Sequence, residues 1–476
     1  MWTHENLDSL EVPLAVSNVS PVHAAPDYYY SIPVRLIYKT YPIYHPGKEP
    51  SGYLGWLRQQ EPEIIFDASQ LKTEEDWLKA GEIVFDAPIS FSPGLFTELS
   101  DVRDPAWYEK VGTPVAKDGT LPFFKYVVRE KGKVELAAFA CANCHTRVMP
   151  GGEVIKGAQG NFPMDRAVGY AWRKLGAESK NQQEFLNIVR LFERFIFDTP
   201  WLNPNPHARL GQMSLGDIAS NNEVIPPGVV ARQRASLFNP VCISDLIGIK
   251  ERRYLDRTGL VQHRSITDMM LYGALNQGAD DLSRFGDFCP AELFYGKYPD
   301  PARLTRYSDE QLYALALYLY SLKPPPNPHK FDDLAARGEV VFKRENCAGC
   351  HTPPLYTNNK LTPVKGFKVP EEHQETFDVL PISVGTNPHL ALNTRRGTGY
   401  YKVPSLKGVW YRGPFTHSGA VATLEDWFDP RRTRDDYTPT GYRPVGVKTQ
   451  AVQGHPFGLK LSAEDRKALI AFLNTL

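Results

Sequence analysis

The sequence has little that points toward nucleic acid, membranes or disorder. Its 54 Lys and Arg residues balance 54 Asp and Glu residues, which argues against nucleic acid or an anionic membrane surface as the main partner. No apolar run approaches the roughly 20 residues that a membrane-spanning helix needs. The opening residues, MWTHENLDSL, have neither the basic nor the apolar segment of a secretory leader. What remains is a globular chain of 476 residues with room for about two or three domains.

Cysteine and methionine are scarce, with six residues of each, and no methionine follows Met270. Four of the cysteines lie in two short runs, Cys141-Ala-Asn-Cys144-His145 and Cys347-Ala-Gly-Cys350-His351. Both runs read C-x-x-C-H, the motif that attaches c-type haem through two thioether bonds and supplies a histidine to the iron. A zinc half-site would need a second Cys or His pair, and a redox dithiol needs no adjacent histidine. Two such motifs therefore predict two covalently bound haem c groups.

Haem attachment of this type belongs to an oxidising compartment outside the cytoplasm. We therefore expect a periplasmic or secreted protein whose leader is absent from this sequence. Cys242 and Cys289 are the cysteines that remain. In such a compartment they can form a disulfide, and the alternative is a pair of buried thiols that pack as small apolar side chains.

Three pairs of segments repeat in the same order along the chain. Residues 308–322 match 462–476, and Ser308 and Ser462 are typical helix N-caps. The second pair is 81–85 and 338–342, each a short helical run that begins at a glycine. The third pair is 245–259 and 405–419, followed by the similar stretches 265–268 and 423–426. The repeats predict a mainly α fold with two cytochrome c-like haem domains related by duplication, carrying long insertions.

The run Lys323-Pro-Pro-Pro-Asn-Pro328 cannot continue a helix and marks a domain boundary. We predict an N-terminal haem domain over 72–323 and a C-terminal haem domain over 329–476. Residues 1–71 lie outside the repeat and are rich in Tyr and Pro. They predict a loop-rich extension that coats the haem domains, with the lining of a substrate channel as the alternative.

The two predicted haems differ in the residue available opposite the proximal histidine. For the second haem, His455 is the preferred ligand and His417 the alternative, because no methionine lies downstream. In the repeat, position 417 corresponds to Arg257 and position 455 to Pro301, and neither is an ordinary haem ligand. Met164 is the remaining candidate for the first haem, although a methionine there also suits a core. The first haem is thus predicted to be the reactive one.

Polar residues of the first half offer groups for cleaving an O–O bond. Asp268 or His263 could move a proton, and Arg257 could stabilise the departing charge. The structural alternative is an ordinary loop salt bridge and an aspartate at the start of a helix.

Several runs in the last third resemble bacterial dihaem cytochrome c peroxidases and their superfamily. They are Lys402-Val-Pro-Ser-Leu-Lys-Gly-Val-Trp410, Gly413-Pro-Phe-Thr-His-Ser-Gly419 and Thr423-Leu-Glu-Asp426. That superfamily includes the methylamine-utilisation dihaem enzyme and the rubber oxygenases. The ending Gly454-His455-Pro-Phe-Gly458 is most similar to the rubber-oxygenase branch.

The resemblance implies chemistry at the N-terminal haem, with Asp268 at the position of the peroxidases' acidic residue. It also implies, in many members, a calcium ion between the domains. The peroxidases' distal histidine after the first motif and their methionine after the second-half His-Ser-Gly are both absent.

These observations predict a haem-dependent oxidoreductase of the peroxidase or oxygenase type. It would activate hydrogen peroxide or dioxygen at the first haem while the second, six-coordinate haem relays or stores electrons. Its partner would be a small redox protein or an organic, apolar substrate. The alternative is a dihaem cytochrome c that only transfers electrons to a periplasmic redox partner.

Overall fold

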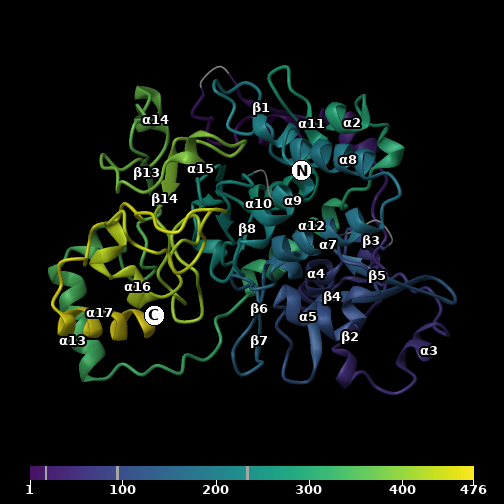
Figure 1. The fold of residues 1–476 in the computed structure, drawn as a ribbon, viewed down its shortest axis with the longest axis horizontal. Helices are drawn as coiled ribbons and strands as arrows, with labels where there is room; N and C mark the ends of the chain where they lie inside the picture. The colour runs from purple at the N-terminus through teal and green to yellow at the C-terminus, as the bar shows by residue number, and fades with distance from the viewer. Residues whose placement is uncertain (17–18, 93–95, 232–234) are drawn as a thin grey trace.

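The computed structural model describes the whole chain except residues 17–18, 93–95 and 232–234. Helices account for 38% of the residues and strands for 13%. The prediction of a mainly α duplication is therefore wrong. Its main omission is a sheet in the N-terminal half that includes much of the insertion between residue 86 and the first C-x-x-C-H motif (Figure 1).

That sheet is antiparallel and has the strand order β2-β4-β5-β3. Its long strand, β4 (Thr120–Glu130), contains the β-branched and aromatic residues that favour strands. The remaining strands form two-stranded pairs, and no helix in the described part of the chain is long and apolar enough to cross a membrane. The other strands are β1 (Pro21–His23), β2 (Thr40–Tyr44), β3 (Ser90–Phe91), β5 (Lys133–Ala138), β6 (Thr146–Val148), β7 (Val154–Lys156), β8 (Val229–Val230), β9 (Val241–Cys242), β10 (Tyr254–Leu255), β11 (Val261–Gln262), β12 (Ser283–Phe285), β13 (Leu361–Pro363) and β14 (Tyr400–Lys402).

The helices are short apart from a few in the first half and the terminal pair in the second (Figure 1). They are α1 (His4–Asp8), α2 (Pro26–Ser31), α3 (Tyr53–Leu57), α4 (Glu74–Asp86), α5 (Pro105–Val111), α6 (Cys141–Cys144), α7 (Met164–Glu178), α8 (Gln182–Phe197), α9 (Leu215–Glu223), α10 (Ile266–Leu282), α11 (Pro290–Tyr295), α12 (Asp309–Ser321), α13 (Asp333–Arg344), α14 (Glu371–Thr376), α15 (His389–Leu392), α16 (Leu424–Trp427) and α17 (Ala463–Asn474).

Two helix pairs share one packing contact, α4 with α12 and α13 with α17. A Cβ added to Gly81 of α4 would overlap the carbonyl of Ala314, and one added to Gly338 of α13 would overlap that of Ala468. Ser308 and Ser462 accept hydrogen bonds from the backbone of the first turns of α12 and α17, which confirms both predicted N-caps. The residues that matched in sequence therefore make the same local contact, although the whole chain is not a simple duplication.

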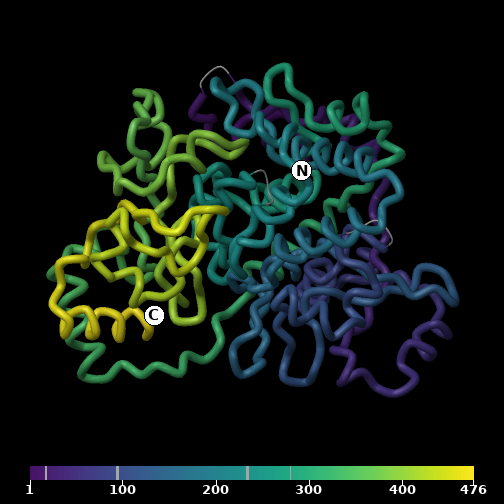
Figure 2. The backbone as a smooth tube through the Cα atoms, viewed as in Figure 1, coloured from purple at the N-terminus to yellow at the C-terminus, as the bar shows by residue number. Residues whose placement is uncertain are grey.

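The N-terminal extension is built into the fold rather than laid over it. The side chain of Trp2 is fully buried and stacks on Tyr29 with ring centroids 4.0 Å apart. Strand β1 pairs with β12, and β2 pairs with β4 of the sheet. The two ends of the chain lie in different halves of the molecule (Figure 2).

Segments of the second half insert into the first. Gln159 donates to the carbonyl of Pro414 over 3.1 Å, and the backbone NH of Cys242 donates to the carbonyl of His417 over 2.8 Å. The guanidinium of Arg395 is fully buried, where it pairs with Asp280 at 3.0 Å and donates to the carbonyl of Asp198. No helix interrupts the stretch between Ser321 and Asp333, which links the halves.

Candidate haem-binding and redox site

The first C-x-x-C-H motif forms the one-turn helix α6 and presents a neutral imidazole. Nδ1 of His145 lies 2.9 Å from the carbonyl oxygen of Ser244, so this nitrogen carries the proton and Nε2 is left as a ligand. Burial lowers the pKa of His145 to about 4, which keeps the ring in the form that binds metals. Burial also raises the pKa of the Cys141 and Cys144 thiols to about 12, opposite to what a reactive dithiol needs.

The second motif repeats this arrangement on the one-turn 3₁₀ helix η7 (Cys347–Gly349). Nδ1 of His351 faces the carbonyl oxygen of Tyr356 at 3.2 Å, and the Pro404 carbonyl also hydrogen-bonds the ring. Burial again lowers the pKa of the histidine to about 4. Both motifs therefore hold a neutral histidine by a backbone carbonyl, with the other ring nitrogen free.

His455 lies opposite His351. The two ring centroids are 6.3 Å apart, and the planes are inclined by 53°. Two imidazoles on either side of one metal have centroids about 6 Å apart, given metal–nitrogen bonds of roughly 2.0 Å. The pair thus fits an iron held by both histidines.

The backbone fixes His455 in this place. The backbone NH of His455 donates to the carbonyl of Val384 over 2.6 Å. Its carbonyl accepts a hydrogen bond from the guanidinium of Arg432 over 2.8 Å. Burial, together with the nearby His351, lowers the pKa of the His455 imidazole to about 3. Its Nδ1 is buried and has no hydrogen-bond partner among the described residues, so no bond to the protein competes with a metal for this imidazole.

His417, the alternative ligand, lies elsewhere. Its ring stacks on Tyr401 with centroids 4.4 Å apart, and its carbonyl is bound by the first half at Cys242. Burial, with smaller effects of Arg257 and His389, lowers its pKa to about 3. The contacts described for His417 do not include His351.

No second imidazole faces His145 among the described residues. Met164 lies in an apolar pocket with Asn143, Phe162 and Ala167, and His145 does not line that pocket. The two motif histidines therefore have unequal surroundings.

The three residues considered for catalysis make local structural contacts. Arg257 donates to the carbonyls of Cys242 and Ile243. His263 bridges the Arg252 carbonyl at 2.7 Å and the Tyr320 hydroxyl at 2.5 Å. Their catalytic role stays a prediction.

Asp268 closes a capping box at the start of α10. Its carboxylate accepts from the backbone NH of Ser265 and pairs with Arg264 at 2.9 Å. The Ser265-Ile-Thr-Asp268 pattern already carried this structural signal. The carboxylate lies in hydrogen bonds that hold a helix end, so its catalytic role also stays a prediction.

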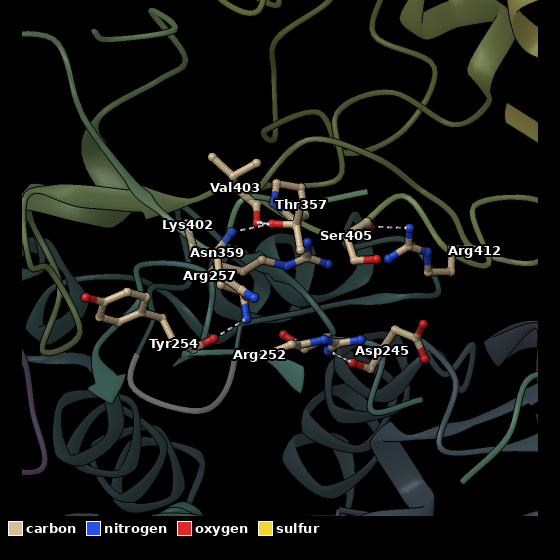
Figure 3. A pocket seen from close by; sticks show the side chains of 12 residues that line it. Asp245, Arg252, Tyr254, Arg257, Thr357, Asn359, Lys402, Val403, Ser405 and Arg412 are labelled. Carbon is tan, nitrogen blue, oxygen red and sulfur yellow. Dashed lines mark hydrogen bonds between the residues drawn. The ribbon is translucent and has the colours of Figure 1, made fainter. Parts of the chain in front are cut away.

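A cationic pocket is lined by Ser244 and Pro404, whose carbonyls hydrogen-bond the two motif histidines (Figure 3). It contains four cationic side chains and one carboxylate, those of Arg252, Arg257, Lys402, Arg412 and Asp245. Among the described residues, no group of three or more His, Cys, Asp or Glu could hold a metal ion. The side chains of this pocket do not fit the calcium ion that the family resemblance implies, because Ca²⁺ requires an oxygen-rich, anionic site.

Sequence reasoning missed this pocket, although one signal was present. Arg252 and Arg412 occupy the same position in the third repeated pair of segments. Lys402, which lines the pocket with these two arginines, lies outside the repeated segments and has no matching residue in the first half.

The remaining cysteines are unpaired. Cys242 and Cys289 are both buried, and the Cys242 thiol donates to the Pro414 carbonyl at 3.3 Å. Of the two alternatives, the structure has the buried thiols.

No model of a known protein family matches the chain, and no curated protein sequence matches it. Two solved structures resemble it weakly. A hydrazine synthase of Kuenenia stuttgartiensis, studied under xenon pressure, has a TM-score of 0.31 at 16% identity, covering 61% of this chain and 87% of that one. A MauG-like protein associated with microbial copper homeostasis has a TM-score of 0.23 at 16% identity, covering 36% of this chain and 57% of that one. Likeness at this level carries no argument about function.

Proposed function

We propose that this chain is a dihaem c-type oxidoreductase that activates hydrogen peroxide or dioxygen at the first C-x-x-C-H motif. The haem of the second motif would relay or store electrons. A bound haem supplies an iron that changes between the ferrous and ferric states and, with an open axial side, binds small oxidants. The observation that supports this proposal is the unequal surroundings of His145 and His351.

The two motifs and His455 would provide the residues that attach the haems and bind their irons. Cys141 and Cys144 would hold one haem and Cys347 and Cys350 the other, with His145 and His351 as proximal ligands. The carbonyls of Ser244 and Tyr356 accept hydrogen bonds from Nδ1 of His145 and His351, which would leave each Nε2 available to the iron. His455 would close the second site, because its imidazole faces His351 at a separation suited to one metal.

The alternative, a cytochrome that only transfers electrons, is favoured by one observation. Arg257, His263 and Asp268 all have their polar groups in structural hydrogen bonds. An electron carrier needs none of them for proton transfer. On either proposal the protein would work in the periplasm or outside the cell, with a small redox protein or an apolar organic molecule as partner.

Stopped-flow spectroscopy on the reduced holoprotein separates the two proposals. With peroxide or dioxygen, the oxidoreductase should reoxidise at a rate that saturates with oxidant concentration. The Cys141→Ser/Cys144→Ser variant, which lacks the first haem, should lose that saturable phase, whereas Cys347→Ser/Cys350→Ser should retain it for a single turnover. Equal, non-saturating reoxidation of both variants would support the electron carrier.

A further inference from the structure

The cationic pocket contains more positive charge than the described residues neutralise. Within the described part of the chain, neither Arg252, Arg257, Lys402 nor Arg412 forms an ion pair. The one carboxylate of the pocket, Asp245, accepts instead from the Tyr411 hydroxyl at 3.0 Å and from the backbone NH of Ile247 at 3.1 Å. A buried excess of charge is costly unless an ion of opposite sign completes the site.

The cations also repel one another. Burial, followed by the charges of Arg252 and Arg257, lowers the pKa of Lys402 well below its ordinary value. Burial lowers the pKa of Arg412 as well; Asp245 and Tyr411 partly oppose this shift, and Arg252 and Arg257 add to it. Lys402 still donates to the carbonyl of Tyr254 at 3.2 Å, so the side chain is fixed at the pocket.

Two of the arginines are placed alike with respect to the two motifs. Arg252 follows Ser244 by eight positions, and Arg412 follows Pro404 by eight. Ser244 and Pro404 are residues whose carbonyls hydrogen-bond His145 and His351. Each arginine also donates to the carbonyl of the residue next to that one, Asp245 in the first half and Ser405 in the second.

Figure 3 shows both arginines lining the pocket, Arg252 beside Asp245 and Arg412 beside Ser405. Arg412 offers a donor to a ligand, because its Nε is buried and has no hydrogen-bond partner among the described residues. Arg257 differs from Arg412, because its Nε and one terminal nitrogen donate hydrogen bonds to the carbonyls of Cys242 and Ile243. Arg252 likewise donates through both terminal nitrogens, to the carbonyls of Asp245 and Ile247, so the buried donor without a partner among these described arginines is that of Arg412.

The chemistry of the missing ligand follows from these donors. A guanidinium presents a planar pair of N–H groups that matches a carboxylate. A haem carries propionate carboxylates, and covalent attachment brings them into the protein together with the ring. We propose that this pocket binds propionates of both haems, with Arg252 pairing with the first haem and Arg412 with the second. This inference rests on the haem binding proposed above.

Resonance Raman spectroscopy of the holoprotein tests the assignment, because the propionate bending band responds to hydrogen bonding. The variants are Arg252→Gln and Arg412→Gln, with Arg252→Lys and Arg412→Lys as charge-preserving partners. Arg173→Gln, which removes an exposed arginine paired with Glu223, is the control. Arg252→Gln should shift the band of the first haem and lower its midpoint potential, and Arg412→Gln should do the same at the second. The lysine variants should restore much of each potential.

Haem content by mass spectrometry is measured first. Absence of covalent haem in the wild-type chain would contradict the proposed function itself. With both haems attached, bands and potentials that match Arg173→Gln in every variant would overturn the propionate assignment. A wild-type potential that follows added sulfate, with unshifted propionate bands, would overturn it in favour of a free inorganic anion.

Discussion

At the scale of residues, the two C-x-x-C-H histidines differ in whether a second imidazole faces them. The C-x-x-C-H runs could be read directly from the sequence because haem attachment requires that spacing. The choice between His455 and His417 could not, since both lie far from His351 in sequence. In the structure His455 faces His351, whereas His417 stacks on Tyr401.

Replacing His455 with alanine should change the spectrum of the second haem. The iron would lose an imidazole, so we expect its low-spin absorption and EPR signals to become high-spin, while the first haem stays unchanged. His417→Ala is the control and should leave the second haem low-spin. The reverse pattern would show that His417 is the ligand.

A buried histidine outside the motifs should make stability depend on pH. His207 is 1% exposed, and its nitrogens lie 3.0 Å from the Thr199 hydroxyl and 2.9 Å from that of Ser236. Burial lowers its pKa to about 4 from the ordinary 6.5. As pH falls below 6.5 the unfolded chain takes up this proton before the folded one, so stability is lost between pH 6.5 and about 4.

The size of this effect can be measured by urea unfolding at pH 7 and pH 4.5. His207 should account for about 2–3 kcal/mol of the loss between these pH values. In His207→Gln the dependence on pH should be smaller by that amount, and the exposed His4→Gln should behave as the wild type. Equal pH dependence in all three proteins would contradict the assignment.

At the scale of elements, local signals predicted the helices better than the sheet. Ser308 and Ser462 predict the starts of α12 and α17, because an N-cap depends only on the few residues of the first helical turn. The sheet was missed because β2 and β4 lie some 80 residues apart, and residues 88–140 read only as an insertion. Pairing between distant strands is not fixed by any local pattern.

Alanine at either shared helix crossing should destabilise the protein. In Gly81→Ala and Gly338→Ala the new methyl group would overlap a carbonyl of the facing helix, at a cost of about 1–3 kcal/mol each. Gly55 lies exposed in α3, with no atom near an added Cβ. Gly55→Ala should therefore stabilise by up to about 1 kcal/mol. Thermal unfolding of the three variants makes the comparison, and equal effects would contradict the close crossings.

At the scale of the whole molecule, the two halves interlock through buried contacts, while each motif histidine is held by a carbonyl of its own half. The repeated segments predict two haem domains related by duplication, whereas the fold is not that duplication and its halves interlock in a way the repeats do not indicate. The buried contact of Arg395 with Asp280 joins residues more than 100 positions apart in sequence. The cationic pocket is likewise lined by segments more than 100 positions apart. Such sites depend on tertiary packing, which a pattern in one sequence does not reveal.

Removing the buried guanidinium of Arg395 should weaken the packing between the two halves and lower the free energy of unfolding. Arg395→Met leaves Asp280 and the Asp198 carbonyl without their partner, so we expect a loss of about 3 kcal/mol in the free energy of unfolding. Arg337, whose partner is Asp465 at the surface, provides the control. Arg337→Met should cost less than about 1 kcal/mol. Similar losses of stability in both variants would contradict a special contribution of buried Arg395 to the contact between the halves.

We propose that the two irons are unequal, with one held by two histidines and the other by one. Low-temperature EPR of the fully oxidised holoprotein, recorded before and after a cyanide titration, measures this directly. We expect one high-spin and one low-spin ferric signal, and we expect one equivalent of cyanide to convert only the high-spin signal. Two low-spin signals that cyanide leaves unchanged in both the oxidised and the half-reduced protein would contradict it.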